Sequence, residues 1–386
     1  MRKLRKLIQP IVLGSSQSPA YFPAFNLQWH LTARCQQNCL HCYMHDEPTY
    51  LSEFENELDH KTCLRIIDDF VNSFGDKCRL QINFTGGDPL LREDIFDLMK
   101  YATKKRIRVN ILGNPNLVTP KIAKRLKKVG LGHYQVSIDG LEKTHDRLRG
   151  RKGLFKDTLR AIKILKEAGI APVVMFTLSK VNAEELIEVI RLLASKEVAV
   201  FDFARFVPIG SGKAIRGAIL TSKEYHALLL KVLYEYKKLK EEGTRTVLGQ
   251  KENLWTLLFQ ELGFFKPDPN IKNLILGGCS LGSSILTILA DGTVYSCRRL
   301  PVKIGKVPEQ SLWDIFINSP EHNKIRNSFK KGKCGDCDLF QYCRGCPAVA
   351  YGVYGDYSAP DPQCWKEVRK NGPKRDRDPR RGRSTG

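Results

Sequence analysis

Twelve cysteines constrain this chain of 386 residues more than any other feature, because ten of them fall into two separate groups. Three lie close together near the N-terminus with the spacing C-x3-C-x2-C, and seven lie between residues 279 and 364. A chain of this length can bury a sizeable core without disulfides, so grouped cysteines indicate metal ligands rather than cross-links. Free thiols in such number suit a reducing compartment, and we expect the cytoplasm.

From residue 26 to about residue 206, short β-branched or aromatic runs alternate with amphipathic stretches, which is typical of a parallel sheet covered by helices. The predicted strands are 26–31, 80–84, 108–112, 134–138, 173–178 and 198–204. The predicted helices are 57–74, 93–104, 120–128, 154–168 and 183–195. Six such units predict an α/β fold with a partial (β/α)6 barrel of the TIM type, because right-handed crossovers leave the strand C-termini free for a site.

Changes in composition divide the chain into five segments. We expect an N-terminal segment (1–25), the partial barrel (26–220), a helical extension and linker (221–273), a cysteine-rich domain (274–365) and a basic tail (366–386). The tail carries nine Lys or Arg against three acidic residues, so it cannot bury enough apolar surface to fold, and we expect disorder. The net charge of +22 indicates either a solvated basic surface or an acidic partner.

Cys35, Cys39 and Cys42 directly follow the first predicted strand, so three thiolates converge at the C-terminal mouth of the predicted barrel. A closed zinc site would need a fourth ligand, for which His41 or His45 is available. A [4Fe–4S] cluster held by three cysteines instead leaves one iron open to a substrate. The spacing alone leaves both alternatives open.

The run 35–43, Cys-Gln-Gln-Asn-Cys-Leu-His-Cys-Tyr, resembles the cluster motif of the radical S-adenosylmethionine (SAM) superfamily, in which the open iron chelates SAM. The run 86–89, Gly-Gly-Asp-Pro, resembles the Gly-Gly-Glu-Pro element of that superfamily, with an aspartate where glutamate is usual. The resemblance implies a [4Fe–4S] cluster on the first cysteine group and a SAM pocket beside it. It assigns to that pocket Tyr43, Gly86, Gly87, Asp88, Asn114, Ser137, Asp139 and Arg149. Residues of these types also form turns and helix caps, and that alternative stays open.

The C-terminal cysteines have knuckle-like spacing, with a quartet C-x2-C-x5-C-x2-C at residues 334–346 that on its own also fits a zinc ribbon. With the upstream motifs, the whole series is similar to the SPASM domain of the same superfamily, which carries up to two auxiliary [4Fe–4S] clusters. When the ligand positions of the SPASM domain are carried over to this sequence, the resemblance implies that Cys279, Cys297 and Cys346 bind the first auxiliary cluster. This cluster thus has only three cysteines. The second takes Cys334, Cys337, Cys343 and Cys364. Cys63 and Cys78 are interpreted as buried apolar residues.

The resemblance implies an enzyme that reductively cleaves SAM to a 5′-deoxyadenosyl radical, which abstracts hydrogen from an unactivated C–H bond. Proteins with these domains mostly modify ribosomally made peptides or protein side chains, so we expect a peptide maturase. The run 342–365 resembles peptide maturases of the selenobiotic, thio(seleno)oxazole type.

Three alternatives remain: a tetrapyrrole side-chain enzyme of the haem pathway, a sulfatase-maturase-like enzyme and a non-catalytic iron–sulfur carrier. Arg298 weakens the sulfatase alternative, because sulfatase maturases have an acidic residue at that position that can act as a base. As partners we expect a peptide or protein substrate and an acidic electron donor such as ferredoxin or flavodoxin. Nucleic acid is disfavoured, and no apolar run of 18 residues indicates a membrane.

Overall fold

The computed structural model describes residues 24–45, 49–249, 251–268, 270, 275–328 and 332–368. Most of the expected N-terminal segment, and the basic tail from residue 369 onward, lie outside these described residues. None of the helices in the described ranges has the length and apolar character needed to cross a membrane.

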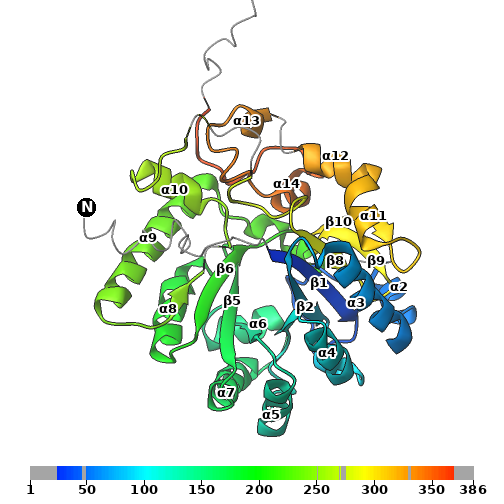
Figure 1. Ribbon diagram of the computed structural model, residues 1–386. Helices are drawn as coiled ribbons and strands as arrows, with labels where there is room; N and C mark the ends of the chain where they lie inside the picture. Colours follow the sequence, from blue (N-terminus) through cyan, green and yellow to red (C-terminus); the bar gives the residue numbers. More distant parts are fainter. Residues whose placement is uncertain are drawn as a thin grey trace, which may run out of the picture.

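One ten-stranded sheet forms the centre of the molecule, in the order β10-β9-β8-β1-β2-β3-β4-β5-β6-β7 (Figure 1). The strands are β1 (Ala24–Thr32), β2 (Arg79–Gly86), β3 (Arg108–Leu112), β4 (His133–Ser137), β5 (Ala171–Leu178), β6 (Val200–Arg205), β7 (Val247–Leu248), β8 (Ile285–Ile288), β9 (Thr293–Cys297) and β10 (Leu300–Lys306). Strands β1 to β7 run parallel, which confirms the expected parallel α/β sheet. The short β7, which was not predicted, adds a further strand beside β6.

Helices cover the outer face of this curved sheet (Figure 1). The predicted helices correspond to α3 (His60–Phe74), α4 (Ile95–Lys104), α5 (Pro120–Lys128), α7 (Leu154–Glu167) and α8 (Leu186–Ser195). The region predicted as helical after the barrel contains α9 (Ser222–Glu241) and α10 (Trp255–Glu261), with β7 between them. Two short helices next to the candidate site were not predicted, α2 (Thr49–Glu55) and α6 (Glu142–Arg149). Three short 3-10 segments complete this part: Pro89–Leu91, Ala183–Glu185 and Gly210–Ala218.

The barrel strands alternate between an apolar outer face and a polar inner face, because successive side chains of a strand point to opposite sides. On β1, Leu27 and Trp29 are fully buried in the core shared with the helices, whereas Gln28 lines a cavity. On β2 and β3, Asn110 Nδ2 donates to Asn83 Oδ1 over 3.0 Å. The polar inner face is the surface on which the candidate site is built.

The C-terminal domain is attached to the barrel through the same sheet. Strand β8 pairs in parallel with β1, from Asn26 opposite Ile285 to Trp29 opposite Ile288, and β9 and β10 continue as antiparallel strands. The helices of this region are α11 (Leu312–Asn318), α12 (Pro320–Ser328), α13 (Gly332–Gly335) and α14 (Pro347–Tyr354), coloured orange to red in Figure 1. The continuous sheet fixes the C-terminal cysteines relative to the barrel.

Candidate active site

The first cysteine group lies in the loop after β1, where contacts from the loop after β3 and from α6 hold it. Asn114 Nδ2 donates to Cys35 Sγ over 3.3 Å, and Leu40 N donates to the Leu148 carbonyl over 2.9 Å. The three thiols are close enough to interact electrostatically: Cys35, Cys39 and Cys42. The fold therefore brings these cysteines together, and their ligation of a cluster stays a prediction.

The thiols of this group are suited to a metal cluster rather than to free thiol chemistry. Burial raises the pKa of Cys39 to about 12, against an opposing effect of Arg149, and burial also raises the pKa of Cys42. A thiol with so high a pKa keeps its proton at neutral pH, whereas cluster ligands are thiolates. Cluster binding therefore has to displace protons. Three soft donors in one buried loop fit a [4Fe–4S] cluster.

The glycines of the Gly-Gly-Asp-Pro run are required by close approach to the first cysteine loop. A Cβ on Gly86 would lie 2.3 Å from the Thr32 carbonyl oxygen, and one on Gly87 would lie 2.0 Å from that of Arg34. Gly87 N donates to the Thr32 carbonyl over 2.8 Å. Both glycines also line a cavity beside the loop that carries Cys35, but their backbones first of all pack against that loop.

Asp88 lies behind this cavity rather than on its wall. It is fully buried, and its Oδ1 accepts from Leu90 N over 3.3 Å as the N-cap of the 3-10 turn Pro89–Leu91. Burial raises the pKa of Asp88 to about 6. The structure thus gives Asp88 a capping contact, and a direct role toward SAM stays a prediction.

Asp139 and Arg149 form a buried ion pair beside the first cysteine group. Arg149 Nε donates to Asp139 Oδ2 over 2.6 Å, and Thr177 N donates to Asp139 Oδ1 over 2.7 Å. Burial opposes ionisation of Asp139, but Arg149 and His41 outweigh it and hold its pKa well below the usual range. The charge of Arg149 is therefore already balanced by the protein. Ser137 ends β4 on the cavity side.

A cavity of about 160 Å³ lies between the first cysteine group and the C-terminal ends of β3 to β6, and we call it the SAM-side cavity. The three cysteines of the first group line it, and so do most residues that the sequence assigned to the SAM pocket: Tyr43, Gly86, Gly87, Asn114, Ser137 and Arg149. Sequence reasoning missed other lining residues: Gln135, Met175, Thr177, Arg205, Arg298 and Arg299. Gln135, Met175, Thr177 and Arg205 lie near the C-terminal ends of β4, β5 and β6. The alternation of side chains along these strands could have identified them as residues that face the cavity.

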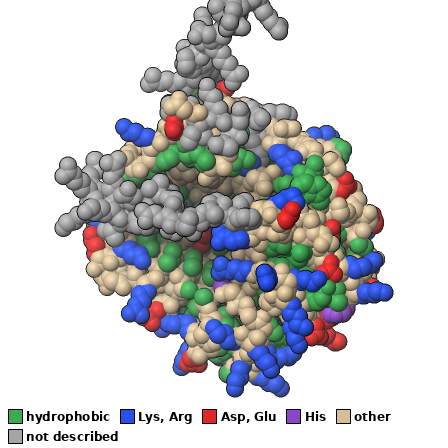
Figure 2. Space-filling view, viewed as in Figure 1, with side chains coloured by type: hydrophobic (Ala, Val, Ile, Leu, Met, Phe, Trp, Pro, Cys, Tyr) green, Lys and Arg blue, Asp and Glu red, His purple; other side chains and the backbone are tan. Residues whose placement is uncertain are grey.

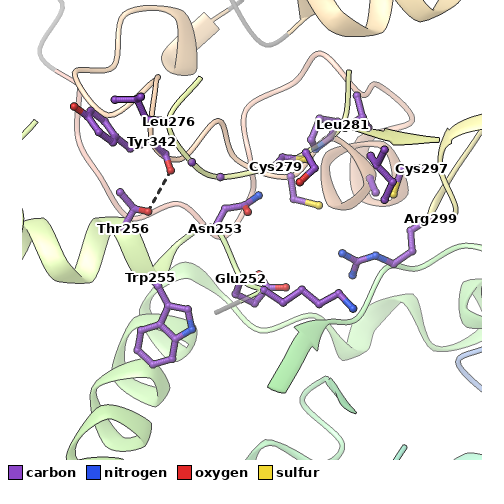
Figure 3. Close-up of a pocket in the computed structure, with 18 of the residues that line it drawn as sticks. Glu252, Asn253, Trp255, Thr256, Leu276, Cys279, Leu281, Cys297, Arg299 and Tyr342 are labelled. Carbon is purple, nitrogen blue, oxygen red and sulfur yellow. Dashed lines mark hydrogen bonds between the residues drawn. The ribbon is translucent and has the colours of Figure 1, made fainter. Parts of the chain in front are cut away.

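The C-terminal cysteines separate into two sets, in the division that the SPASM resemblance implied. Cys279, Cys297 and Cys346 interact electrostatically and line a cavity of about 440 Å³, and Figure 3 shows Cys279 and Cys297 on its wall. The other set lines a separate, small cavity: Cys334, Cys337, Cys343 and Cys364. Within the described residues no fourth cysteine lines the larger cavity. Cluster ligation by either set stays a prediction.

A tight knuckle places neighbouring cysteines in different sets. Between Cys343 and Cys346, Arg344 has φ 66° and Gly345 has φ 62°, a left-handed conformation that costs a non-glycine residue free energy. Arg344 is held there because its guanidinium donates to the carbonyls of Cys279 (2.7 Å) and Leu281 (2.9 Å). The chain therefore reverses between the two thiols.

The two histidines offered as a fourth zinc ligand have other contacts in the structure. His41 Nε2 lies 3.3 Å from Asp139 Oδ2, and the His45 ring packs on Tyr50 at 4.8 Å. A zinc site that uses either histidine would have to give up these contacts.

A buried ion network joins the barrel to the C-terminal domain. Arg205 at the end of β6 is 1% exposed and donates to Asp361 Oδ1 (2.7 Å) and Oδ2 (2.9 Å) and to Glu252. Asp361 Oδ2 also accepts from Cys346 N over 2.9 Å. Arg205 lines the SAM-side cavity, so a chain of hydrogen bonds runs from that cavity through Asp361 to the backbone N–H of Cys346.

Three cations lie where the two cavities approach each other. Arg298 and Arg299 line both cavities, and Lys251 lines the larger one. Although the Lys251 side chain is exposed to that cavity, desolvation by the surrounding protein and repulsion by Arg298 lower its pKa to about 7, against an opposing effect of Asp202. Figure 3 shows Arg299 pointing from the Cys297 side toward the Glu252 segment.

Comparison with known proteins agrees with this arrangement of two cysteine-rich sites on one sheet. The model of the radical SAM superfamily matches residues 29–193, and that of SPASM, an iron–sulfur cluster-binding domain, matches residues 279–347. AdoMet-dependent heme synthase of Methanosarcina barkeri is 30% identical over 344 residues, which are 88% of this chain and 95% of that protein. Mycofactocin maturase MftC of Mycobacterium tuberculosis is 28% identical over 354 residues, 88% of this chain and 82% of that protein.

Among solved structures, Streptococcus suis SuiB bound to S-adenosylmethionine shares the fold, with a TM-score of 0.66 and 19% identity over 88% of this chain and 76% of SuiB. The chain belongs to the radical SAM superfamily. It is a radical SAM enzyme that binds a [4Fe–4S] cluster and SAM, and its C-terminal SPASM domain binds auxiliary iron–sulfur clusters.

Proposed function

We propose that this enzyme modifies a ribosomally made peptide or protein substrate. The observation that carries the proposal is that the SAM-side cavity and the auxiliary cavity share two wall residues, Arg298 and Arg299, so that one substrate can occupy both. Bound SAM and its cluster supply the radical that abstracts hydrogen from a C–H bond. The residues of this chain bind and orient the substrate and exclude water from the site.

The two cavities have volumes of about 440 and 160 Å³. In this proposal SAM occupies the smaller cavity, an auxiliary cluster takes part of the larger one, and the substrate takes the space that remains. An extended peptide projects its side chains singly to either side, so it can direct different residues toward the two cavities.

The walls of the larger cavity combine apolar rings with fixed polar groups, as ligand sites commonly do. Trp255, Phe259, Phe265 and Tyr342 supply the rings. Thr256 Oγ1 donates to the Tyr342 carbonyl over 3.3 Å, a contact that Figure 3 shows as a dashed line. Contacts of this kind hold α10 against the C-terminal domain, so the cavity is preformed rather than assembled by the substrate.

A tetrapyrrole side-chain reaction is the second candidate. It is supported by the curated relative named as a heme synthase, which is similar over nearly its whole length. The mycofactocin maturase is nearly as similar, at 28% identity against 30%, so identity does not separate the two substrate classes. Sulfatase-type maturation is disfavoured, because the Arg298 guanidinium occupies the cavity position next to Cys297 and stays protonated.

An acidic electron donor such as a ferredoxin or flavodoxin suits the charge of the molecule. Lys and Arg total 63 against 41 acidic residues. Figure 2 shows Lys and Arg side chains spread over the displayed face, with fewer acidic ones among them. Attraction between oppositely charged proteins raises their rate of association, and salt screens this attraction. An acidic donor should therefore associate with this basic enzyme more slowly as the salt concentration rises.

The test compares two substrates on the anaerobically reconstituted enzyme with SAM and a strong reductant. Short peptides encoded beside the gene and iron tetrapyrroles that carry carboxylate side chains are each incubated separately, and products are identified by mass spectrometry together with 5′-deoxyadenosine. We expect a mass change in a peptide and none in the macrocycle. Conversion of a tetrapyrrole with no peptide modified would establish the second candidate in place of the first.

A further inference from the structure

The cations at the junction of the two cavities have no carboxylate in direct contact: within the described ranges, Arg298, Arg299 and Lys251 form no ion pair. Asp202 attracts Lys251 and Glu252 attracts Arg299 only from a longer distance. Arg299 Nη1 donates to the Arg205 carbonyl over 3.0 Å, which fixes its direction without offsetting its charge. Charges partly withdrawn from water are normally paired, so the half-buried guanidinium groups of Arg298 and Arg299 without a carboxylate in direct contact indicate a missing anion.

Arg298 has unused hydrogen-bonding capacity at this junction. Its Nε is buried and has no hydrogen-bond partner among the described residues. The guanidinium lies 5.8 Å from the ring centroid of Tyr43, a contact that orients the cation without engaging its N–H groups. A planar guanidinium with free N–H groups matches a carboxylate, which it can bind through two parallel hydrogen bonds.

Other acidic side chains near the junction are already engaged. Glu252 accepts from Arg205, and Asp202 accepts from Lys251 N and Phe203 N. Burial raises the pKa of Asp202 to about 6, but Asp202 is still mostly ionised at neutral pH and offsets the charge of Lys251. Arg299 is attracted by the thiolates of Cys297 and Cys346, so Arg298 is the cation whose anion is least accounted for by the described residues.

We propose that Arg298, Arg299 and Lys251 bind a carboxylate of the substrate where the two cavities meet. The site holds the substrate by this carboxylate between the SAM-side cavity and the wall formed by Cys297 and Cys346. It thereby fixes which C–H bond is presented to SAM. This inference rests on the proposed function in one respect, which is that the substrate occupies both cavities. It does not depend on the substrate being a peptide, because peptides and tetrapyrroles both carry carboxylates.

Two other anions compete for the same charges, and the test has to separate them. The carboxylate of SAM is one, and the thiolate-ligated auxiliary cluster is the other. If Arg298 pairs with the SAM carboxylate, its replacement should weaken SAM binding. If Arg298 pairs with the auxiliary cluster, its replacement should shift the reduction potential of that cluster.

The first experiment uses glutarate as the probe and its neutral diamide, glutaramide, as the matched control, added to the reduced holoenzyme without SAM, which the reduced enzyme would cleave. Paramagnetic clusters broaden the proton resonances of a ligand bound nearby, so saturable broadening measures the affinity and shows that the probe binds near a cluster. We expect broadening for glutarate and none for glutaramide. Arg298→Gln should weaken glutarate binding by about tenfold or more, since hydrogen bonds to a charged group contribute roughly 1.5–3 kcal/mol.

The control variant is Lys303→Gln, which removes the same charge from an exposed position on β10 and should leave glutarate binding unchanged. Lys251→Met provides a second variant in case Arg298→Gln does not fold, and it should also weaken glutarate binding. SAM affinity and the auxiliary-cluster potential should stay at wild-type values in both cavity variants.

Equal broadening by glutarate and glutaramide would overturn the proposal. So would Arg298→Gln and Lys251→Met variants that bind glutarate normally, or that lose only SAM affinity or only shift the cluster potential. Because this assay needs no peptide, its outcome is independent of whether a peptide is the substrate. Modification of a peptide by an enzyme that ignores glutarate would leave the proposed function intact and refute the carboxylate site.

Discussion

Replacement of Asp361 by Ala tests whether the buried ion network holds the two domains together. Asp361 accepts from Arg205 Nη1 and Nη2 and from the backbone N–H groups of Cys346 and Gln363, at distances between 2.7 and 3.0 Å. Alanine leaves the Arg205 guanidinium buried with Glu252 as its remaining carboxylate partner. Removal of one member of a buried ion pair typically costs about 3–5 kcal/mol, and we expect the free energy of unfolding to fall by that amount.

The measurement is urea unfolding of the reconstituted enzyme under anaerobic conditions, together with its iron content. We expect loss of iron from the first auxiliary site, because Cys346 loses the acceptor of its N–H. The matched control is Glu167→Ala, which removes a carboxylate from an exposed pair with Lys163 and should change stability by at most about 0.5 kcal/mol. An Asp361→Ala protein within about 1 kcal/mol of wild type and with full iron would refute the reasoning.

Four further predictions follow from the site and its charges. Replacing all cysteines of the first group by Ala should remove about four irons and all SAM cleavage while auxiliary iron stays, as elemental analysis would show. Cys346→Ala should disturb the first auxiliary cluster and stop product formation but still permit SAM cleavage, as 5′-deoxyadenosine assays would show. Because burial raises the pKa of Asp88 to about 6, the cluster-free protein should lose about 3 kcal/mol of stability as pH rises from about 4 to above 6, and Asp88→Asn should remove that loss in urea unfolding. Deletion of 370–386, which lie outside the described residues, should weaken flavodoxin binding and its salt dependence.

The parallel strands and the cysteine groups could be predicted because their signals are local. Apolar runs of strand length and the C-x3-C-x2-C spacing need only neighbouring residues to be recognised. The partners of charged residues could not be predicted in this way. The acidic residue of the Gly-Gly-Asp-Pro run caps a turn, and Asp139 pairs with Arg149. Both contacts are short-range, but the local sequence does not show which of several possible partners a carboxylate takes. Neither carboxylate lines the SAM-side cavity.

The contacts between domains were missed for the same reason. Arg205 and Asp361 are separated by 156 residues, and nothing in the sequence around either one indicates the other. Arg298 was noticed only as a departure from sulfatase maturases. Its place on the wall of both cavities depends on β9 lying beside β8 and β8 beside β1, a strand order that periodicity does not reveal.

The same strand order sets the distance between the two cofactor sites. Tyr295 of β9 pairs with Thr287 of β8, which in turn pairs with Gln28 of β1, so Cys297 lies near the level at which β1 begins. Cys35 follows the opposite end of that strand. At about 3.3 Å per residue, β1 separates the two levels by roughly 20 Å, too far for the two clusters to touch. In the proposed function, a substrate that exchanges an atom with SAM and an electron with the auxiliary site lies between the two sites, next to Arg298 and Arg299, which line both cavities.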